Sequence, residues 1–404
     1  MMEKRIITRF KGRICTACIQ DGTAVELTLE EEEHSVLNRI YTGRVQKIVP
    51  GINAAFIDTG DFTGYYSLTE NRSHLFTDTS RKDGPLRQGD EILVQVSRDG
   101  VKTKAPVLTS NLSLPGRYCV VTAGKTGIGI SNKINDPLLK KEIKIRLEKL
   151  PLDGFGLIVR TNALQADAEM LEAEGIRLKK RLEKLIKDSS CRTCGSCLYH
   201  PLPSYITGVR DAYEGQLDSI ITDDRAIYGQ LKAYLEEEQK DDLKKLQFYD
   251  DPLLPLSKLY SLETILERAL GKRVWLKSGG YLVIEPTEAM TVIDVNTGKY
   301  EGKKKMADTI RRINKEAAQT IAAQLRLRNL SGIIMVDFID MEQEEDKKEL
   351  LDCLKQAVSK DPIHTVVVDM TPLGLVEITR KKIRKPLYEQ AGQTYDGTQG
   401  DKRI

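Results

Sequence analysis

The stretch from Met290 to Met341 constrains the fold most, because two short apolar segments in it flank a longer amphipathic one. The apolar segments end at Asn296 and Asp337. Between them, apolar residues recur every three or four positions, as on one face of a helix: Met306, Ile310, Ile313, Ala317, Ile321 and Leu325. This order predicts a βαβ unit, whose right-handed crossover places both strands parallel in one sheet.

Two aspartates stand at the ends of the predicted strands, Asp294 in the first and Asp337 in the second. Open α/β sheets bind their ligands at the C-terminal ends of such strands. Two like charges repel unless a cation lies between them, and hard oxygen ligands suit Mg²⁺. The spacing alone leaves two interpretations open, a metal site or two surface residues at strand ends.

Length and composition indicate a multidomain globular protein. The chain has 404 residues, 40% hydrophobic and 30% charged, with a net charge of +3. No apolar run approaches the roughly 18 residues of a membrane span, and the N-terminus lacks the apolar core of a signal peptide, so we expect a cytoplasmic protein. The basic run 379–386, which we expect to be helical, is the best candidate for an RNA-facing strip.

Short strands with closely spaced turns follow Tyr41 and predict a small barrel of the OB type. Aromatic residues on such barrels stack against bases, and basic residues follow the backbone. Phe56, Tyr65 and Lys104 are the candidates for these contacts. The alternative is that Phe56 and one tyrosine fill the barrel core.

A predicted strand from Gly156 ends in Arg160 and Thr161. An arginine fork and a hydroxyl at this place are suited to gripping a phosphate. The alternative is that Arg160 forms a salt bridge within the protein.

The cysteines at 191, 194 and 197 are followed by a histidine at the same spacing, as Cys191-x-x-Cys194-x-x-Cys197-x-x-His200. Three thiols and an imidazole can complete a tetrahedral zinc site, and the thiol spacing is also seen in iron–sulfur ligation. The alternative is a loop with reduced, incidental thiols.

Four sequence runs carry a resemblance to a known family. They are Ser278-Gly-Gly-Tyr-Leu-Val-Ile-Glu285, Thr287-Glu-Ala-Met-Thr-Val-Ile-Asp294-Val-Asn296, Gln324-Leu-Arg-Leu-Arg328 and Val336-Asp337-Phe-Ile-Asp340-Met341. From Met2 to about Lys385 the chain resembles the ribonuclease E/G family of bacterial endoribonucleases. The resemblance implies an α+β and α/β multidomain fold, in which an S1-type OB barrel is inserted in a split RNase H-like domain.

The implied boundaries follow the family architecture. They are 1–35 and 206–270 for the RNase H-like domain, 36–117 for the S1-type OB domain, 118–205 for a 5′-sensor region with the Cys-rich loop, 271–390 for a DNase I-like catalytic domain, and 391–404 for a tail expected to be disordered.

The resemblance also implies an activity, namely Mg²⁺-dependent cleavage of single-stranded RNA to 5′-phosphate and 3′-hydroxyl ends, in ribosomal RNA processing and messenger RNA decay. Asp294 and Asp337 would be the Mg²⁺ ligands, with Asn296 as a catalytic helper. Asp340 is held in reserve, because strand alternation would turn it to the opposite face.

A 5′-phosphate pocket is implied at Arg160, Thr161, Gly116 and Val120, and RNA-binding positions at Phe56, Tyr65 and Lys104. Two positions depart from the family pattern, because Asn132 and His364 stand where arginines are expected. A histidine loses its charge above its pKa, so these departures weaken the expected preference for a 5′-monophosphate.

The family's zinc link between two chains is a C-P-x-C-x-G-x-G motif after the catalytic domain, and this sequence has no cysteine after Cys353. We therefore expect any homo-oligomer to form without that link, and single-stranded RNA to be the main partner. Two other functions remain open, a non-catalytic RNA-binding protein and a metal-sensing RNA binder that uses the segment from Cys191 to His200.

Overall fold

The computed structural model describes residues 2–31, 35–78, 80–81, 83–100, 104–131, 133–134, 136–212, 215–298 and 306–393. The chain divides into two compact units, Met1–Glu32 with Gln216–Ile404, and Glu33–Gly215. Within the described ranges, no helix is long and apolar enough to cross a membrane. Asn132 and most of the predicted tail 391–404, from 394 onward, lie outside these ranges.

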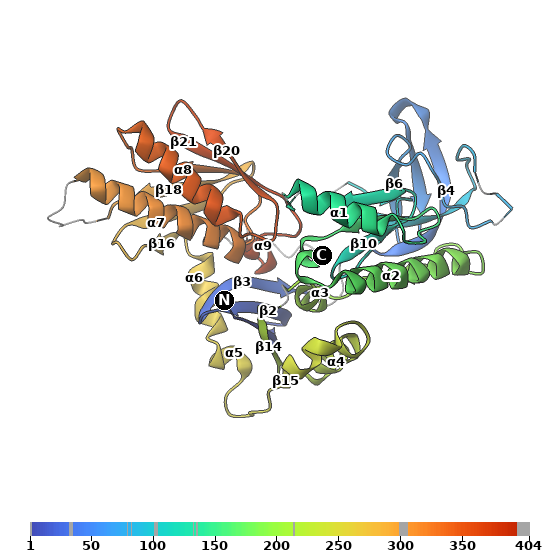
Figure 1. The fold of residues 1–404 in the computed structure, drawn as a ribbon, viewed down its shortest axis with the longest axis horizontal. Helices are drawn as coiled ribbons and strands as arrows, with labels where there is room; N and C mark the ends of the chain where they lie inside the picture. The colour runs from blue at the N-terminus through green and yellow to red at the C-terminus, as the bar shows by residue number, and fades with distance from the viewer. Residues whose placement is uncertain are drawn as a thin grey trace. The chain divides into compact units, whose positions relative to one another are not determined.

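A five-stranded sheet in the first unit joins distant parts of the sequence (Figure 1). Its order is β15(Leu246–Phe248), β14(Leu217–Thr222), β1(Glu3–Phe10), β2(Arg13–Gln20) and β3(Thr23–Glu30). The hairpin of β2 and β3 turns at Asp21 and Gly22, both with positive φ, as tight hairpins require. Asp224 begins the neighbouring helix α4(Arg225–Glu238) by accepting the Ala226 and Ile227 N–H groups. Helices α5(Leu256–Leu259) and α6(Leu262–Leu270) then lead to the next sheet.

A six-stranded sheet completes this unit and contains the predicted βαβ segment. Its order is β16(Arg273–Trp275), β17(Tyr281–Pro286), β18(Met290–Asn296), β19(Gly332–Asp337), β21(Leu375–Arg380) and β20(Thr365–Met370). Strands β18 and β19 are parallel and are linked through α7(Met306–Leu327), so the βαβ prediction is confirmed.

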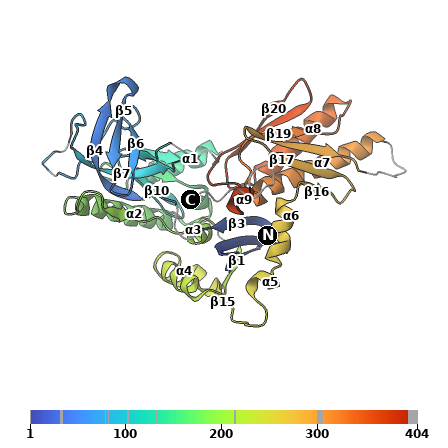
Figure 2. The same ribbon diagram turned by 180° about the vertical axis from the view of Figure 1, so that it is seen from behind.

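Helices α7 and α8(Glu344–Val358) lie on one face of the six-stranded sheet (Figures 1 and 2). The predicted apolar stripe of α7 supplies Ile313, Ala317, Ile321 and Leu325 to the core, all fully buried. Along β18, residues alternate between buried and exposed, and the exposed set includes Asp294. The face of the sheet opposite the helices is therefore the one that carries the exposed aspartate.

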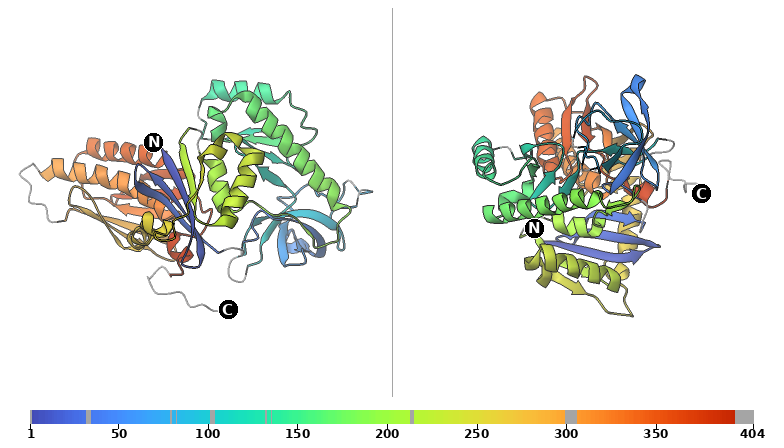
Figure 3. Two further views of the ribbon diagram at one scale, coloured as in Figure 1. Left: turned by 90° about the horizontal axis from the view of Figure 1, so that it is seen from below. Right: turned by 90° about the vertical axis from the view of Figure 1, so that its right-hand side faces the viewer.

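A closed five-stranded barrel in the second unit is consistent with an S1/OB-like domain, and the chain as a whole is a mixed α/β multidomain protein. The barrel is formed by β4(Ile40–Val49), β5(Ala54–Asp58), β6(Thr63–Ser67), β8(Val107–Thr109) and β7(Glu91–Arg98), and pairing of β4 with β7 closes it (blue to cyan in Figure 3). Tyr66 is fully buried in its core, whereas Phe56 is half-buried on the outside. Of the two, only the tyrosine is a core residue.

A four-stranded sheet follows the barrel in the order β11(Gly127–Ile130), β12(Gly156–Val159), β10(Cys119–Thr122) and β9(Ser113–Pro115). Helix α1(Pro137–Leu147) connects β11 to β12, and helix α2(Ala168–Ser189) packs on the sheet. Glu174 of α2 is 5% exposed, and its carboxylate accepts the N–H groups of Arg117, Tyr118 and Cys119 at 2.7–2.9 Å. The acid thereby fixes the turn before β10. Strand β13(Cys197–Tyr199) and helix α3(Ser204–Asp211) end this unit.

The basic run 379–386 is not a helix, and this prediction is wrong. Strand β21 continues to Arg380, and the next helix, α9(Leu387–Gln390), begins only after Pro386. Proline disfavours helical backbone in the residue before it. Arg380 is 3% exposed, and its guanidinium donates to Asp361 at 2.7 Å. Part of the run therefore holds the fold together instead of facing RNA.

Candidate active site

Asp294 and Asp337 lie directly opposite each other on the parallel strands β18 and β19. Neighbouring strands are about 4.8 Å apart, so in-register residues on one face bring their side chains close together. Both aspartates are exposed, while their neighbours Ile293 and Val336 are fully buried against the helices. The structure thus brings together the two predicted metal ligands on the open face of the sheet.

Asn296 lies two residues beyond Asp294 on the same face of β18. Its Nδ2 donates a hydrogen bond to Asp294 Oδ2 at 2.7 Å. This bond orients the carboxylate and leaves the amide oxygen as an acceptor for water or another donor. The predicted catalytic helper is therefore in contact with one of the two acids.

Asp337 carries an unbalanced charge. Partial burial raises its pKa, and the negative charges of Asp294 and Asp340 raise it further. Asp340 is exposed and follows the end of β19 at Asp337 by three residues, so its charge reaches Asp337.

The segment after Asp337 is held by Asn314, a fully buried residue of α7. Its Nδ2 donates to the Ile339 carbonyl at 2.7 Å, and its Oδ1 accepts the Ile339 N–H at 3.2 Å. The sequence analysis missed this residue. Its signal was a polar side chain inside the apolar stripe, next to Ile313.

The donor set on the open face fits a hard divalent cation. Among the described residues, no three His, Cys, Asp or Glu side chains come together as metal ligands. Mg²⁺, however, keeps several waters and is commonly held by only one or two carboxylates. Asp294 and Asp337, whose mutual repulsion a cation would relieve, are the residues that would hold it.

Arg160 is engaged within the protein. Its Nη1 donates to the Gly116 carbonyl at 2.6 Å and to Asp211 Oδ1 at 2.7 Å. Of the two interpretations of this residue, the structure shows the salt bridge. Thr161, half-buried, begins a short 3-10 helix, and Val120 lies in β10 opposite Ile158 of β12.

Asp211, which is not among the predicted site residues, is the partner of Arg160. Arg210 also donates to it, from Nε to Oδ1 at 2.7 Å. Burial opposes ionisation of Asp211, but the hydrogen bonds from Arg160 and Arg210 outweigh it, and its pKa is lowered. An internal anion thus faces Arg160. His364, which like Asn132 stands where the family pattern has an arginine, is exposed just before β20 in the other unit.

Phe56 and Tyr65 are cross-strand neighbours on β5 and β6. Their ring centroids are 6.1 Å apart in an edge-to-face arrangement, and both rings are half-buried. The Tyr65 N–H donates to the Pro106 carbonyl at 2.8 Å, which places the exposed Lys104 segment beside β6. The three predicted RNA-contacting residues therefore belong to neighbouring segments of the barrel.

The cysteine cluster finds no support as a metal site, because the described residues, which include all four candidates, contain no such ligand group. The turn is bound to β4 instead, since the Gly195 N–H donates to the Thr42 carbonyl at 2.9 Å. Cys191 and His200 are exposed, while burial raises the pKa values of Cys194 and Cys197.

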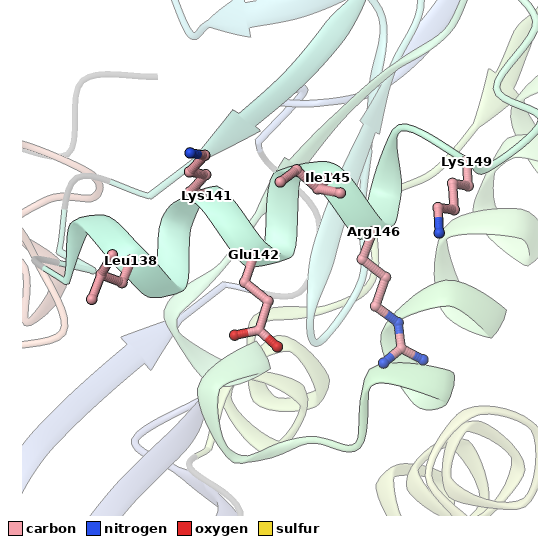
Figure 4. Close-up of a pocket in the computed structure, with 6 residues that line it drawn as sticks. All are labelled: Leu138, Lys141, Glu142, Ile145, Arg146 and Lys149. Carbon is pink, nitrogen blue, oxygen red and sulfur yellow. The ribbon is translucent and has the colours of Figure 1, made fainter.

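A shallow hollow of about 400 Å³ lies along α1 and contains none of the predicted site residues (Figure 4). One helix and the turn after it supply its lining: Leu138, Lys141, Glu142, Ile145, Arg146 and Lys149. Its apolar members Leu138 and Ile145 are 80% and 52% exposed. Without converging polar groups from other elements, this hollow is a helix surface and no ligand site.

The chain is similar in sequence to known proteins over most of its length. A model described as the Ribonuclease E/G family matches residues 113–383. Ribonuclease G of Salmonella typhimurium (strain SL1344) is 37% identical over 383 residues, which cover 91% of this chain and 78% of that protein. Ribonuclease G of Escherichia coli (strain K12) is 35% identical over 382 residues, covering 92% and 78%. Ribonuclease E of Nostoc sp. is 32% identical over 399 residues, covering 97% and 58%.

Proposed function

The chain belongs to the ribonuclease E/G family and is an endoribonuclease. We propose that it cleaves single-stranded RNA in an active site formed by Asp294 and Asp337. The observation that supports this location is the in-register pair of exposed carboxylates, with Asn296 bonded to one of them. The products are a 5′-phosphate and a 3′-hydroxyl, and the substrates include ribosomal RNA precursors and messenger RNA.

The reaction we propose is attack of water on the scissile phosphorus. A new bond forms from the water oxygen to phosphorus, the bond from phosphorus to the 3′ oxygen breaks, and that oxygen takes up a proton. Mg²⁺ held by Asp294 and Asp337 would stabilise charge on the phosphate and activate water. The Asn296 amide oxygen is available to orient the attacking water, because its nitrogen already donates to Asp294.

The remaining regions would bind and position the RNA. The barrel, with Phe56, Tyr65 and Lys104, is proposed as the S1-type RNA-binding domain within 36–117. The region 118–205 would contain the 5′-phosphate pocket, residues 1–35 with 206–270 the split RNase H-like domain, and 271–390 the DNase I-like catalytic domain. These assignments rest on the barrel topology, the five-stranded sheet that spans both parts of the split domain, and the family match.

The test is a cleavage assay with a 5′-hydroxyl single-stranded RNA and increasing Mg²⁺. Asp294→Asn and Asp337→Asn should each lower the rate by about 10²–10³-fold, the effect of losing one group that stabilises transition-state charge. Asp369→Asn is the matched control, because this aspartate is also exposed on the same sheet. Full cleavage by both site variants, or cleavage unaffected by chelation of the metal, would overturn the proposal.

A further inference from the structure

The hairpin of β16 and β17 exposes an aromatic pair on the open face of the catalytic sheet. Trp275 and Tyr281 are cross-strand partners, with ring centroids 5.2 Å apart and planes tilted by 55°. Trp275 is 66% exposed and is the single tryptophan of the sequence. Tryptophan is highly buried on average, so this much exposed ring indicates a surface used for contact.

A cation accompanies the two rings. The guanidinium of Arg273 lies 5.2 Å from the centre of the Tyr281 ring. Arg273 and Trp275 are two residues apart on β16, so they share one face of the sheet, while Val274 between them packs against the core. Exposed aromatic rings with an arginine are the groups that stack on unpaired bases and neutralise a nearby phosphate.

The aromatic pair is in register with the catalytic residues. Tyr281 lies directly opposite Asn296, and Val283 lies opposite Asp294, across β17 and β18. Trp275, Tyr281 and Asn296 therefore form one row across three neighbouring strands. At about 4.8 Å per strand, this row spans roughly 10 Å, the reach of a near neighbour of the scissile nucleotide.

The hairpin is fixed in place by contacts to the catalytic strand and to α7. The Glu316 carboxylate accepts the Lys277 N–H at 2.6 Å and the Ser278 N–H at 3.1 Å. Gly280 packs so tightly that a Cβ there would lie 2.7 Å from the Asn296 carbonyl oxygen. A glycine is therefore required for this approach, and the rings are held in a fixed position beside the active site.

We propose that Trp275, Tyr281 and Arg273 form a stacking subsite for one unpaired nucleobase of the RNA that is cut at Asp294 and Asp337. This inference rests on the proposed function and extends it to substrate selection. A base inside a duplex is stacked on its neighbours and cannot offer its face to the protein, whereas a base of single-stranded RNA can be splayed onto an aromatic ring. The subsite would therefore favour unpaired RNA without reading its sequence.

The single tryptophan allows a direct test, because fluorescence from Trp275 reports on this site alone. The Asp337→Asn variant of the full chain would be titrated with a short single-stranded RNA, with the same strand in a duplex, and with strands in which one base at a time is replaced by an abasic site. We expect quenching by the single strand, little by the duplex, and loss of quenching at one abasic position. Unchanged emission at RNA concentrations that saturate binding by anisotropy would overturn the proposal.

Substitutions provide the second measurement. Trp275→Ala should weaken RNA binding, or raise KM, by roughly 5- to 150-fold, the range for loss of one stacked base. Trp275→Phe should restore most of the affinity because it keeps an aromatic face. Leu253→Ala is the control, since Leu253 is 92% exposed on a loop of the same unit. Equal effects of the Ala and Phe variants would contradict stacking.

The experiment separates this inference from the proposed function. If Asp294→Asn abolishes cleavage while Trp275→Ala changes neither affinity nor KM, the subsite is wrong and the active site stands. If RNA quenches the fluorescence of Trp275 but neither the wild type nor any variant cleaves RNA, the proposed cleavage site is wrong and the stacking subsite stands. A shift in the wavelength of maximum Trp275 emission as protein concentration rises, in the absence of RNA, would overturn the subsite. It would make this face a contact between copies of the chain.

Discussion

Asp337 and Asp211 have the same side chain in opposite electrostatic surroundings. Within the described ranges, Asp337 forms no ion pair, and burial together with the charges of Asp294 and Asp340 raises its pKa. Asp211, in the other unit, is bound by Arg160 and Arg210, and its pKa is lowered despite burial. An uncompensated acid is a place for a cation to bind, whereas a compensated acid organises the arginines around it.

The two regions also differ in how their loops are supported. A neutral amide, Asn314, holds the segment after Asp337 by bonding both backbone groups of Ile339. A carboxylate, Glu174, holds the turn before β10 by accepting three N–H groups. A neutral support adds no further negative charge beside acids that already repel each other. The catalytic region should therefore depend mainly on geometry and the Arg160 region mainly on charge.

Among the tests of this comparison, loss of the Asn314 hydrogen bonds should change activity the most. In Asn314→Ala, two buried backbone groups of Ile339 lose their partners, and the segment that carries Asp340 is no longer fixed to α7. Outer contacts that orient metal ligands are commonly worth 10–100-fold in activity, so we expect a loss of that size in kcat.

The control for Asn314 is Thr320→Ala on the same helix, whose hydroxyl donates to the Glu316 carbonyl of the preceding turn. Circular dichroism and RNA affinity should stay near wild type in both variants. A folded Asn314→Ala protein with normal kcat would contradict the proposal that activity depends on how Asn314 holds the segment after Asp337.

Replacing the internal anion should have a smaller effect with the opposite sign. Asp211→Asn removes the charge that faces Arg160 and leaves the guanidinium available to a 5′-phosphate. A hydrogen bond to a charged group is worth about 1.5–3 kcal/mol, and solvent screening of the partly exposed Asp211 reduces it, so discrimination should rise by up to about tenfold. The measurement is kcat/KM for one RNA carrying either a 5′-monophosphate or a 5′-hydroxyl.

Arg160→Gln provides the matched variant for this test, because it removes the guanidinium and should abolish any preference. If Asp211→Asn instead lowers discrimination, Asp211 positions Arg160 for the phosphate and does not compete with it. The contrast between Asp211 and Asp337 would then concern only their effects on the stability of the protein.

The sequence was sufficient for the strands that carry Asp294 and Asp337, because their signals are local. The four-residue recurrence from Ile313 to Leu325 and the two apolar strands predicted the βαβ unit, and strand-end position placed Asp294 opposite Asp337. Barrel strands β4 to β7 were visible for the same reason. Strand β8, only three residues long, has no period to detect.

The sequence failed where distant partners decide the structure. Arg160 meets Asp211 across 51 residues, and Arg384 meets Glu26 across 358 residues. No local pattern encodes such pairs. The basic run 379–386 therefore suggested a helix and an RNA-facing strip, while tertiary ion pairs use Arg380 and Arg384 inside the fold.

The smallest predicted effect is on thermal stability, and its sign differs between the two aspartates. The lowered pKa of Asp211 means that its pairing stabilises the fold above the unfolded value of about 3.9, and that this contribution is lost as pH falls toward the folded value. Because its side chain is 37% exposed, solvent screening limits the contribution to about 1 kcal/mol or less. Asp211→Asn should thus lower Tm by at most roughly 2–4 °C at pH 7, and the difference from wild type should disappear as pH falls through the folded pKa of Asp211.

Asp337 should behave in the reverse way, because its raised pKa means that ionisation at neutral pH works against folding. Asp337→Asn should raise Tm slightly at pH 7 without divalent metal. This advantage should shrink as pH falls below the folded pKa and vanish below the unfolded value of about 3.9. Added Mg²⁺ should stabilise wild type and not the variant, since it binds the folded pair. Calorimetry at several pH values from 7 down to about 2, with and without Mg²⁺, measures all of these shifts. If Asp337→Asn and Asp211→Asn shift Tm in the same direction at pH 7, the two acids are not electrostatic opposites.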